Sequence, residues 1–173
     1  MDPWIQTYTG RRFFFLNPKP EDIDIIDIAH ALSNQCRYAG HTQTFYSVAE
    51  HSYWVSKRVT PENARVALMH DAAEAYLPDV PGPIKQCLGD SWHGIERRIW
   101  AAIAEAFGLN PVIPDGVHDI DTRILLDERE HLMKKPPAPW HCDGLEPVGV
   151  KPMCWTPSEA RDEFIRRFLE LRS

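Results

Sequence analysis

Apolar side chains recur at helical spacing along most of the chain, in segments that fifteen prolines separate. The first clear stripe covers residues 25–32 and follows Pro20, which predicts a helix that begins near this proline. Ser47 is followed three residues later by Glu50, and this pair matches a capping box. The pattern therefore predicts a second helix that begins at Ser47 and carries His51 in its first turns.

More helical stripes follow. Residues 60–76 form one, and residues 90–107 form another that places Ala106 on its inner face. The prolines within residues 78–83 predict a stiff loop between these two helices. Pro114 begins a further stripe, and the chain ends in one more. The sequence therefore predicts an all-α fold of five or six main helices.

The first residues follow a different pattern. Side chains alternate between Trp4 and Tyr8, and Thr9-Gly10 is typical of a turn, so we expect a short β-hairpin or extended arm. Such a ribbon is not stable alone and must pack on the helical body or on a neighbouring subunit. We expect a single domain, divided into a hairpin or arm over 1–19, a metal-site helical core over 20–134, a long loop over 135–155 and a C-terminal helix over 156–173.

Composition narrows the class of protein. The 25 acidic and 19 basic residues give a net charge of -6, which argues against a nucleic-acid polymer as partner but not against a small anionic ligand. No apolar run approaches the ~18 residues of a membrane span, and no signal peptide is recognisable. Four cysteines without regular spacing suggest reduced thiols. We expect a cytoplasmic protein that does not contact a membrane.

The candidate metal-binding residues centre on the adjacent pair His70-Asp71. Adjacent helical residues point about 100° apart, so both can bind one cation at the edge between them. His51 lies on the preceding, antiparallel helix. Asp121 interrupts an apolar helix face, and a charged side chain there needs a partner. Asp119 is the alternative ligand, if the match to the ligand position is shifted by two residues. We predict that His51, His70, Asp71 and Asp121 bind a divalent cation with open positions for water and substrate.

Three sequence blocks carry a resemblance to a known family. They are Ser47-Val-Ala-Glu-His-Ser52, Met69-His-Asp-Ala-Ala-Glu74 and Asp79-Val-Pro-Gly-Pro-Ile-Lys85. Together with Asp121 they resemble the H…HD…D signature of the HD-domain phosphohydrolases, and among these the bacterial 5′-deoxynucleotidases and the dATP triphosphohydrolases of phages. The resemblance, over about residues 35–125, implies an HD-domain helical bundle. It also implies one divalent ion (Co, Mn, Ni, Zn or Mg), with room for a second.

The resemblance implies further roles around the ion. Glu74 matches an acid that orients or deprotonates the attacking water, and Arg37 matches an arginine on the α-phosphate. Tyr38 stands where the family usually has a tryptophan against the sugar and base, which leaves the base preference open. The other implied substrate contacts are Asp79 near the deoxyribose 3′-hydroxyl, Pro83 in the pocket wall, and Lys85 and His118 near the phosphates.

The implied activity is hydrolysis of a deoxynucleotide at the α-phosphate. By resemblance we favour a dATP triphosphohydrolase, which yields deoxyadenosine and triphosphate, in the cytoplasm of a bacterium or of a phage-infected host. The alternative is a 5′-deoxynucleotidase acting on deoxynucleoside monophosphates. Hydrolysis of (p)ppGpp or a cyclic nucleotide would normally require further domains or ligands, and a non-catalytic, regulatory HD module would normally lack a ligand or the acid. We expect a homo-oligomer.

Overall fold

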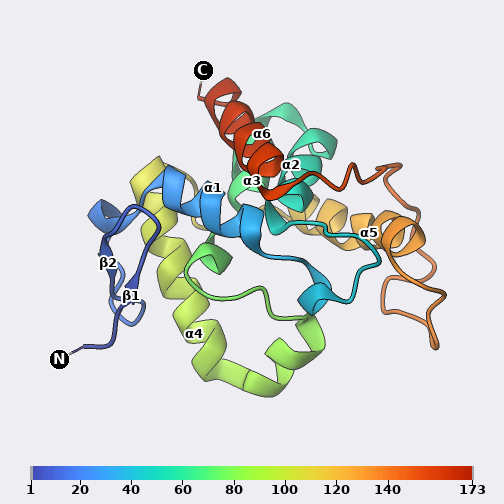
Figure 1. Ribbon diagram of the computed structural model, residues 1–173, viewed down its shortest axis with the longest axis horizontal. Helices are drawn as coiled ribbons and strands as arrows, with labels where there is room; N and C mark the ends of the chain where they lie inside the picture. The colour runs from blue at the N-terminus through green and yellow to red at the C-terminus, as the bar shows by residue number, and fades with distance from the viewer. Residues whose placement is uncertain (1, 173) are drawn as a thin grey trace.

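The computed structural model describes residues 2–172, and within them helices are the dominant regular structure. The prediction of an all-α protein with a short N-terminal hairpin is confirmed (Figure 1). Among the described residues, no helix is both long and apolar enough to cross a membrane. The α-helices are α1 (Ile25–Asn34), α2 (Val48–Arg58), α3 (Ala64–Met69), α4 (Gly82–Phe107), α5 (Asp115–Leu132) and α6 (Pro157–Glu170), and the strands are β1 (Ile5–Gln6) and β2 (Arg12–Phe13).

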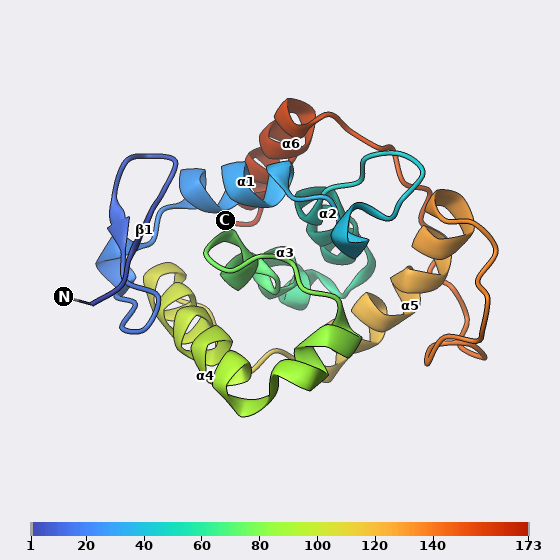
Figure 2. The same ribbon diagram turned by 60° about the horizontal axis from the view of Figure 1, so that its bottom comes forward.

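The short helix α3 lies in the middle of the molecule, with the longer helices around it (Figure 2). Helices α1, α2 and α6 contact one another on one side of it. Helices α4 and α5 follow each other along the opposite side, as the turned view shows. This arrangement places the end of α3, where His70 and Asp71 follow, between α2 and α5.

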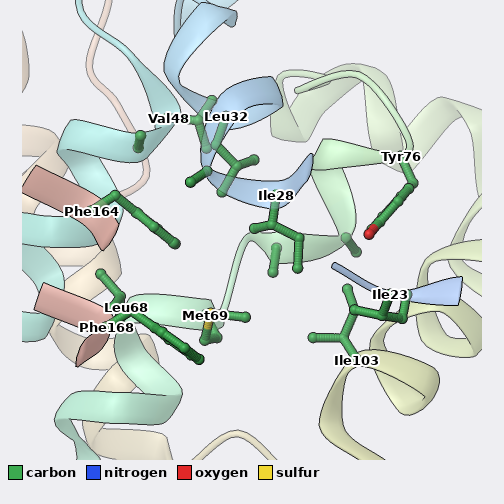
Figure 3. Packing of buried hydrophobic residues seen from close by; sticks show 14 of the residues in the cluster. Ile23, Ile28, Leu32, Val48, Leu68, Met69, Tyr76, Ile103, Phe164 and Phe168 are labelled. Carbon is green, nitrogen blue, oxygen red and sulfur yellow. The ribbon is translucent and has the colours of Figure 1, made fainter. Parts of the chain in front are cut away.

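Aromatic side chains of α6 fill the core beside α3. Phe164 and Phe168 lie next to Leu68 and Met69, and Figure 3 shows this group continuing towards Ile28 of α1. All five side chains are at least 98% removed from solvent. The predicted apolar stripe of residues 25–32 therefore faces the core, and so do Phe164 and Phe168 in the stripe predicted at the end of the chain.

The predicted start of α2 is confirmed, but only half of its capping box forms. The Ser47 hydroxyl accepts the Glu50 N–H at 3.0 Å. The Glu50 carboxylate does not return to Ser47. It accepts the backbone N–H groups of Met153, Cys154 and Trp155 at 2.6, 3.2 and 2.8 Å.

Several predicted helix boundaries are wrong. Near Pro20 only a 3₁₀ helix (Pro20–Asp22) forms, and α1 begins later because Asp24 caps it by accepting the Ile26 N–H at 2.9 Å. The predicted helix over 60–76 is also divided. It stops at Met69, and a 3₁₀ helix (Ala72–Ala75) follows, in which the Glu74 N–H bonds to the Asp71 carbonyl.

The predicted loop over 78–83 is shorter than expected, since α4 already begins at Gly82. A break at Gly89, with φ 69° and ψ −159°, separates this first part from the predicted helix over 90–107. Glycine tolerates this left-handed φ without steric cost. Ala106, predicted on the inner face, is exposed.

The N-terminal hairpin packs on the helical body. The Thr9 N–H and hydroxyl donate to the buried Asp27 carboxylate of α1 at 2.7 and 2.9 Å. Tyr8 stacks on His30 with ring centroids 3.6 Å apart. Phe13 is fully buried and stacks on Tyr76 at 3.9 Å. These contacts supply the packing that so short a ribbon needs.

The segment after α5 is irregular over residues 133–156, in agreement with the predicted long loop. Two buried acids bind its backbone. Asp127 of α5 accepts the N–H groups of Val148 and Gly149 at 2.9 and 3.1 Å. Glu50 of α2 binds residues 153–155 near its end, as described above. The loop is thus anchored next to His51 and Glu128, the chain neighbours of these two acids.

Truncation of the core aromatic Phe164 to alanine should destabilise the protein by about 3–5 kcal/mol, because a fully buried side chain leaves a cavity. Leu169→Ala on the same helix is the control, since Leu169 is 55% exposed and should change stability by about 0.5 kcal/mol or less. Urea unfolding followed by circular dichroism measures both. Equal effects of the two substitutions would contradict the described core.

Candidate metal centre

His51 of α2 is fully buried, and its two ring nitrogens have different surroundings. Nδ1 lies 2.7 Å from Glu128 Oε1. A carboxylate accepts hydrogen bonds, so Nδ1 carries the proton. Nε2 lies 3.0 Å from Asp121 Oδ1, without the alignment of a hydrogen bond, and is buried without a hydrogen-bond partner.

His70 follows the last residue of α3 and shows the same division of roles. Its Nδ1 lies 2.7 Å from the Ala67 carbonyl oxygen, which can only accept, so this nitrogen also carries a proton. Nε2 is buried without a hydrogen-bond partner, 3.6 Å from Asp121 Oδ1. Both imidazoles therefore direct an unpaired nitrogen at the same carboxylate.

His51, His70 and Asp121 form a compact group whose ligand atoms all lie within 4.8 Å of one another, so the group could hold a metal ion. Two oriented imidazoles and a carboxylate are donors that suit first-row divalent cations. The fourth predicted ligand, Asp71, lies beside the group. Its Oδ2 is 3.6 Å from His51 Nε2 and 3.4 Å from His70 Nε2.

The choice of Asp121 over Asp119 agrees with the helix periodicity of α5. Asp121 faces the two histidines, and they hold the pKa of its carboxyl well below the ordinary value although burial opposes this. Asp119 is 55% exposed and pairs with Arg123 at 3.0 Å. The two acids lie on different sides of the helix because two residues correspond to about 200°.

Glu128 is part of the site and was not predicted. It is fully buried, and besides His51 its carboxylate accepts bonds from Arg37 Nε at 3.3 Å and the Tyr38 hydroxyl at 2.5 Å. Burial raises its pKa, but Arg37 and His51 outweigh this and lower it to about 2. Glu128 follows Asp121 by seven residues and so shares its apolar face. This seven-residue spacing from Asp121 is the sequence feature that could have identified Glu128 as part of the site.

Arg37 and Tyr38 lie directly against this network. The Arg37 guanidinium is buried and lies between Glu128 and Asp71, with Nη1 3.6 Å from Asp71 Oδ2. The Tyr38 ring lies 5.4 Å from the guanidinium carbon and 5.9 Å from the Trp140 ring. Tyr38 has a left-handed φ of 56°, a conformation that non-glycine residues adopt mostly at constrained sites.

Glu74 and Lys85 form a neighbouring ion pair. Lys85 Nζ lies 2.9 Å from Glu74 Oε1 and 2.9 Å from Glu96 Oε1. Glu74 Oε2 is buried without a hydrogen-bond partner. Burial, together with the charges of Asp71 and Asp79, raises the pKa of Glu74 to about 8, although Lys85 opposes the shift.

The remaining predicted residues differ in their placement. Asp79 is partly buried, and its N–H donates to the Gln35 side chain at 2.8 Å; the same side chain donates to the Glu74 carbonyl at 2.8 Å. Pro83 is exposed in the first turn of α4, and His118 is exposed on α5. The structure thus brings Asp79 close to Glu74 but leaves Pro83 and His118 at the surface.

The fold and this group define a mainly helical protein with a buried His/Asp centre. No family model matches the chain. The chain is 40% identical over 172 residues to Escherichia coli K12 YfdR, described as an uncharacterized protein, across 97% of this chain and 95% of YfdR. It is also 38% identical over 120 residues to an uncharacterized protein of Rhodobacter capsulatus, across 64% of this chain and 61% of that protein. The chain therefore belongs to the same family as YfdR.

Replacement of Asp121 by asparagine should weaken Mn²⁺ binding by more than about tenfold, because a charged ligand is lost. Asp119→Asn is the matched control on the same helix and should leave the affinity unchanged. Isothermal titration calorimetry with MnCl₂ measures both dissociation constants. Weakening by Asp119→Asn alone would show that the register of the ligand acid is wrong.

The raised pKa of Glu74 predicts a pH-dependent stability of the metal-free protein. In the unfolded chain this carboxyl ionises near 4.5, but in the fold it keeps its proton up to about pH 8. The folded state therefore binds more protons within this window, and its stability should fall as the pH rises from about 4.5 to 8. The Glu74→Gln variant should not show this fall in stability.

Urea unfolding at several pH values measures the stability difference between Glu74→Gln and the wild type. The difference should shift in favour of the variant as the pH rises. Glu130→Gln, at an exposed position of α5, is the control and should follow the wild type. A wild-type-to-Glu74→Gln difference that is constant with pH would contradict the raised pKa.

Proposed function

We propose that the protein is an HD-type, metal-dependent phosphohydrolase that cleaves deoxynucleotides at the α-phosphate. One observation carries the proposal: the Nε2 atoms of His51 and His70 are buried without hydrogen-bond partners and converge with Asp121. Unsatisfied buried nitrogens are costly, and a cation bound between them removes this cost. The order of these residues and of Asp71 along the chain resembles that of the HD phosphohydrolases.

The cation would be held by His51, His70 and Asp121, with Asp71 beside them. When bound, it would supply a Lewis acid that polarises a phosphate and lowers the pKa of a water molecule. Arg37 is well suited to hold the α-phosphate. Glu128 fixes its Nε, and its Nη1 lies 3.6 Å from Asp71 Oδ2, so the guanidinium is held next to the proposed cation. Its planar fork of donors matches phosphate oxygens.

Glu74 would orient the attacking water and accept its proton. The charge of a bound cation would favour the ionised form of Glu74, which can accept a proton, and the buried Oε2 of Glu74 lacks a hydrogen-bond partner. Lys85 fixes the other oxygen at 2.9 Å. Water then adds to the α-phosphorus as the bond to the 5′-oxygen breaks, and the leaving 5′-oxygen takes up a proton to become the nucleoside hydroxyl, which balances the proton that Glu74 removes from the water. Arg37 and Lys85 stabilise the negative charge on the phosphate oxygens.

The base and sugar would lie beyond Arg37. Tyr38 and Trp140, whose rings lie 5.9 Å apart, offer aromatic surface on this side of the site. Asp79 is the acid we assign to the deoxyribose 3′-hydroxyl. We favour dATP as substrate, with deoxyadenosine and triphosphate as products. A 5′-deoxynucleotidase would use the same residues on monophosphates.

The direct test is a panel of deoxynucleoside tri- and monophosphates and ATP, assayed with Mn²⁺, Co²⁺ or Mg²⁺ and resolved by chromatography. We expect dATP to yield deoxyadenosine and triphosphate, and Glu74→Gln and Asp71→Ala to lower kcat by at least about 100-fold. Glu130→Gln is the matched control for the first substitution and should keep wild-type activity.

Release of inorganic phosphate from monophosphates alone would replace the triphosphohydrolase with the 5′-deoxynucleotidase. Hydrolysis of none of these nucleotides with any of the metals would contradict the proposed function. Undiminished hydrolysis by Asp71→Ala would contradict the assignment of the site.

A further inference from the structure

We propose that Glu128 is a positioning residue that joins the metal centre to the nucleotide-binding side of the site, a role that rests on the proposed function. Its two carboxylate oxygens serve different sides. Oε1 faces His51 Nδ1 at 2.7 Å, and Oε2 faces Arg37 Nε at 3.3 Å and the Tyr38 hydroxyl at 2.5 Å. No other acid among the described residues contacts all three of these side chains.

Because Glu128 is buried, its contacts are not those of an ordinary surface ion pair. The side chain is completely removed from solvent, on a helix face that it shares with Ile124 and Leu132. A buried carboxylate is tolerated only with several hydrogen-bond donors. A residue whose only task was packing would be apolar at this position, because an apolar side chain has no such requirement.

On the metal side, Glu128 sets the orientation of His51. With the Nδ1 proton held by the carboxylate, Nε2 is directed at Asp121 and His70. A carboxylate behind a histidine ligand also increases its basicity and so strengthens metal binding. His70 has the weaker arrangement, in which the Ala67 carbonyl oxygen takes the place of a carboxylate.

On the nucleotide side, Glu128 holds the two residues that we assign to the phosphate and the base. Arg37 is fixed through Nε, and its Nη1 lies on the side of Asp71, 3.6 Å from Asp71 Oδ2 and so next to the candidate metal centre. Tyr38 is fixed through its hydroxyl, although its backbone has a left-handed φ of 56°. The carboxylate thus maintains the distance between the cation and the group that binds the α-phosphate.

The test compares Mn²⁺ affinity, measured by calorimetry without nucleotide, in four variants. Glu128→Gln keeps the size of the side chain but offers one acceptor oxygen instead of two, so we expect binding about 10- to 100-fold weaker. Glu128→Asp keeps the charge and should recover part of the affinity. Glu130→Gln, the same change at an exposed position two residues farther on, should bind as the wild type does.

Tyr38→Phe separates the two sides of the carboxylate. It removes one donor to Oε2 and leaves the His51 contact, so Mn²⁺ affinity should stay within about twofold while the KM for the nucleotide rises severalfold. A purely structural role would not produce this division. Far-ultraviolet circular dichroism and urea unfolding verify that each variant is folded under the assay conditions.

Wild-type Mn²⁺ affinity in folded Glu128→Gln would overturn the proposal, as would equal weakening in Glu130→Gln. If Glu128→Gln does not fold, the comparison rests on Glu128→Asp and Tyr38→Phe. The proposal is then overturned if Glu128→Asp binds Mn²⁺ as the wild type does, or if Tyr38→Phe leaves the KM for the nucleotide unchanged. Failure of the proposed function is distinguishable, because a wild type that binds Mn²⁺ without hydrolysing nucleotides leaves the metal comparison valid.

Discussion

The buried contact between His51 and Glu128, 2.7 Å from Nδ1 to Oε1, is the interaction on which the polar centre of this fold depends. It joins α2 to α5 across the interior of the molecule, where both side chains are fully buried. The two helices therefore meet through a buried imidazole and a buried carboxylate, and the candidate site residues Arg37, His70 and Asp121 lie around that meeting point.

The neighbours of this pair in the sequence bind the long loop after α5. Glu50 precedes His51 and accepts three backbone N–H groups, and Asp127 precedes Glu128 and accepts two. Adjacent residues on a helix point in different directions. One residue of each pair thus faces the candidate metal centre, while the other anchors residues 133–156. The candidate site and the loop after α5 are therefore held by the same turns of α2 and α5.

Local patterns in the sequence were sufficient to predict the presence of most helices, although not all of their boundaries, and the hairpin. The group formed by His51, His70 and Asp121 was predicted from residue types and helix faces together with the family resemblance. Apolar periodicity placed Asp121 rather than Asp119 on the inner face. The end of α3 was not predictable, because it depends on the turn at Asp71 and on tertiary contacts. Glu128 was missed because an isolated glutamate in a helical stripe is ordinarily solvated, and only the folded chain brings its three donors together.

The relation to YfdR defines the family, and the buried histidines give this chain a candidate metal-binding chemistry. The proposed hydrolysis of deoxynucleotides requires that these histidines and Asp121 bind one cation. A crystal of the protein soaked in MnCl₂ and measured for anomalous scattering tests this most directly. A cation bound by these side chains should give a peak about 2.0–2.3 Å from His51 Nε2, His70 Nε2 and an oxygen of Asp121. Strong peaks elsewhere, with none between these three side chains, would contradict the proposed cation binding.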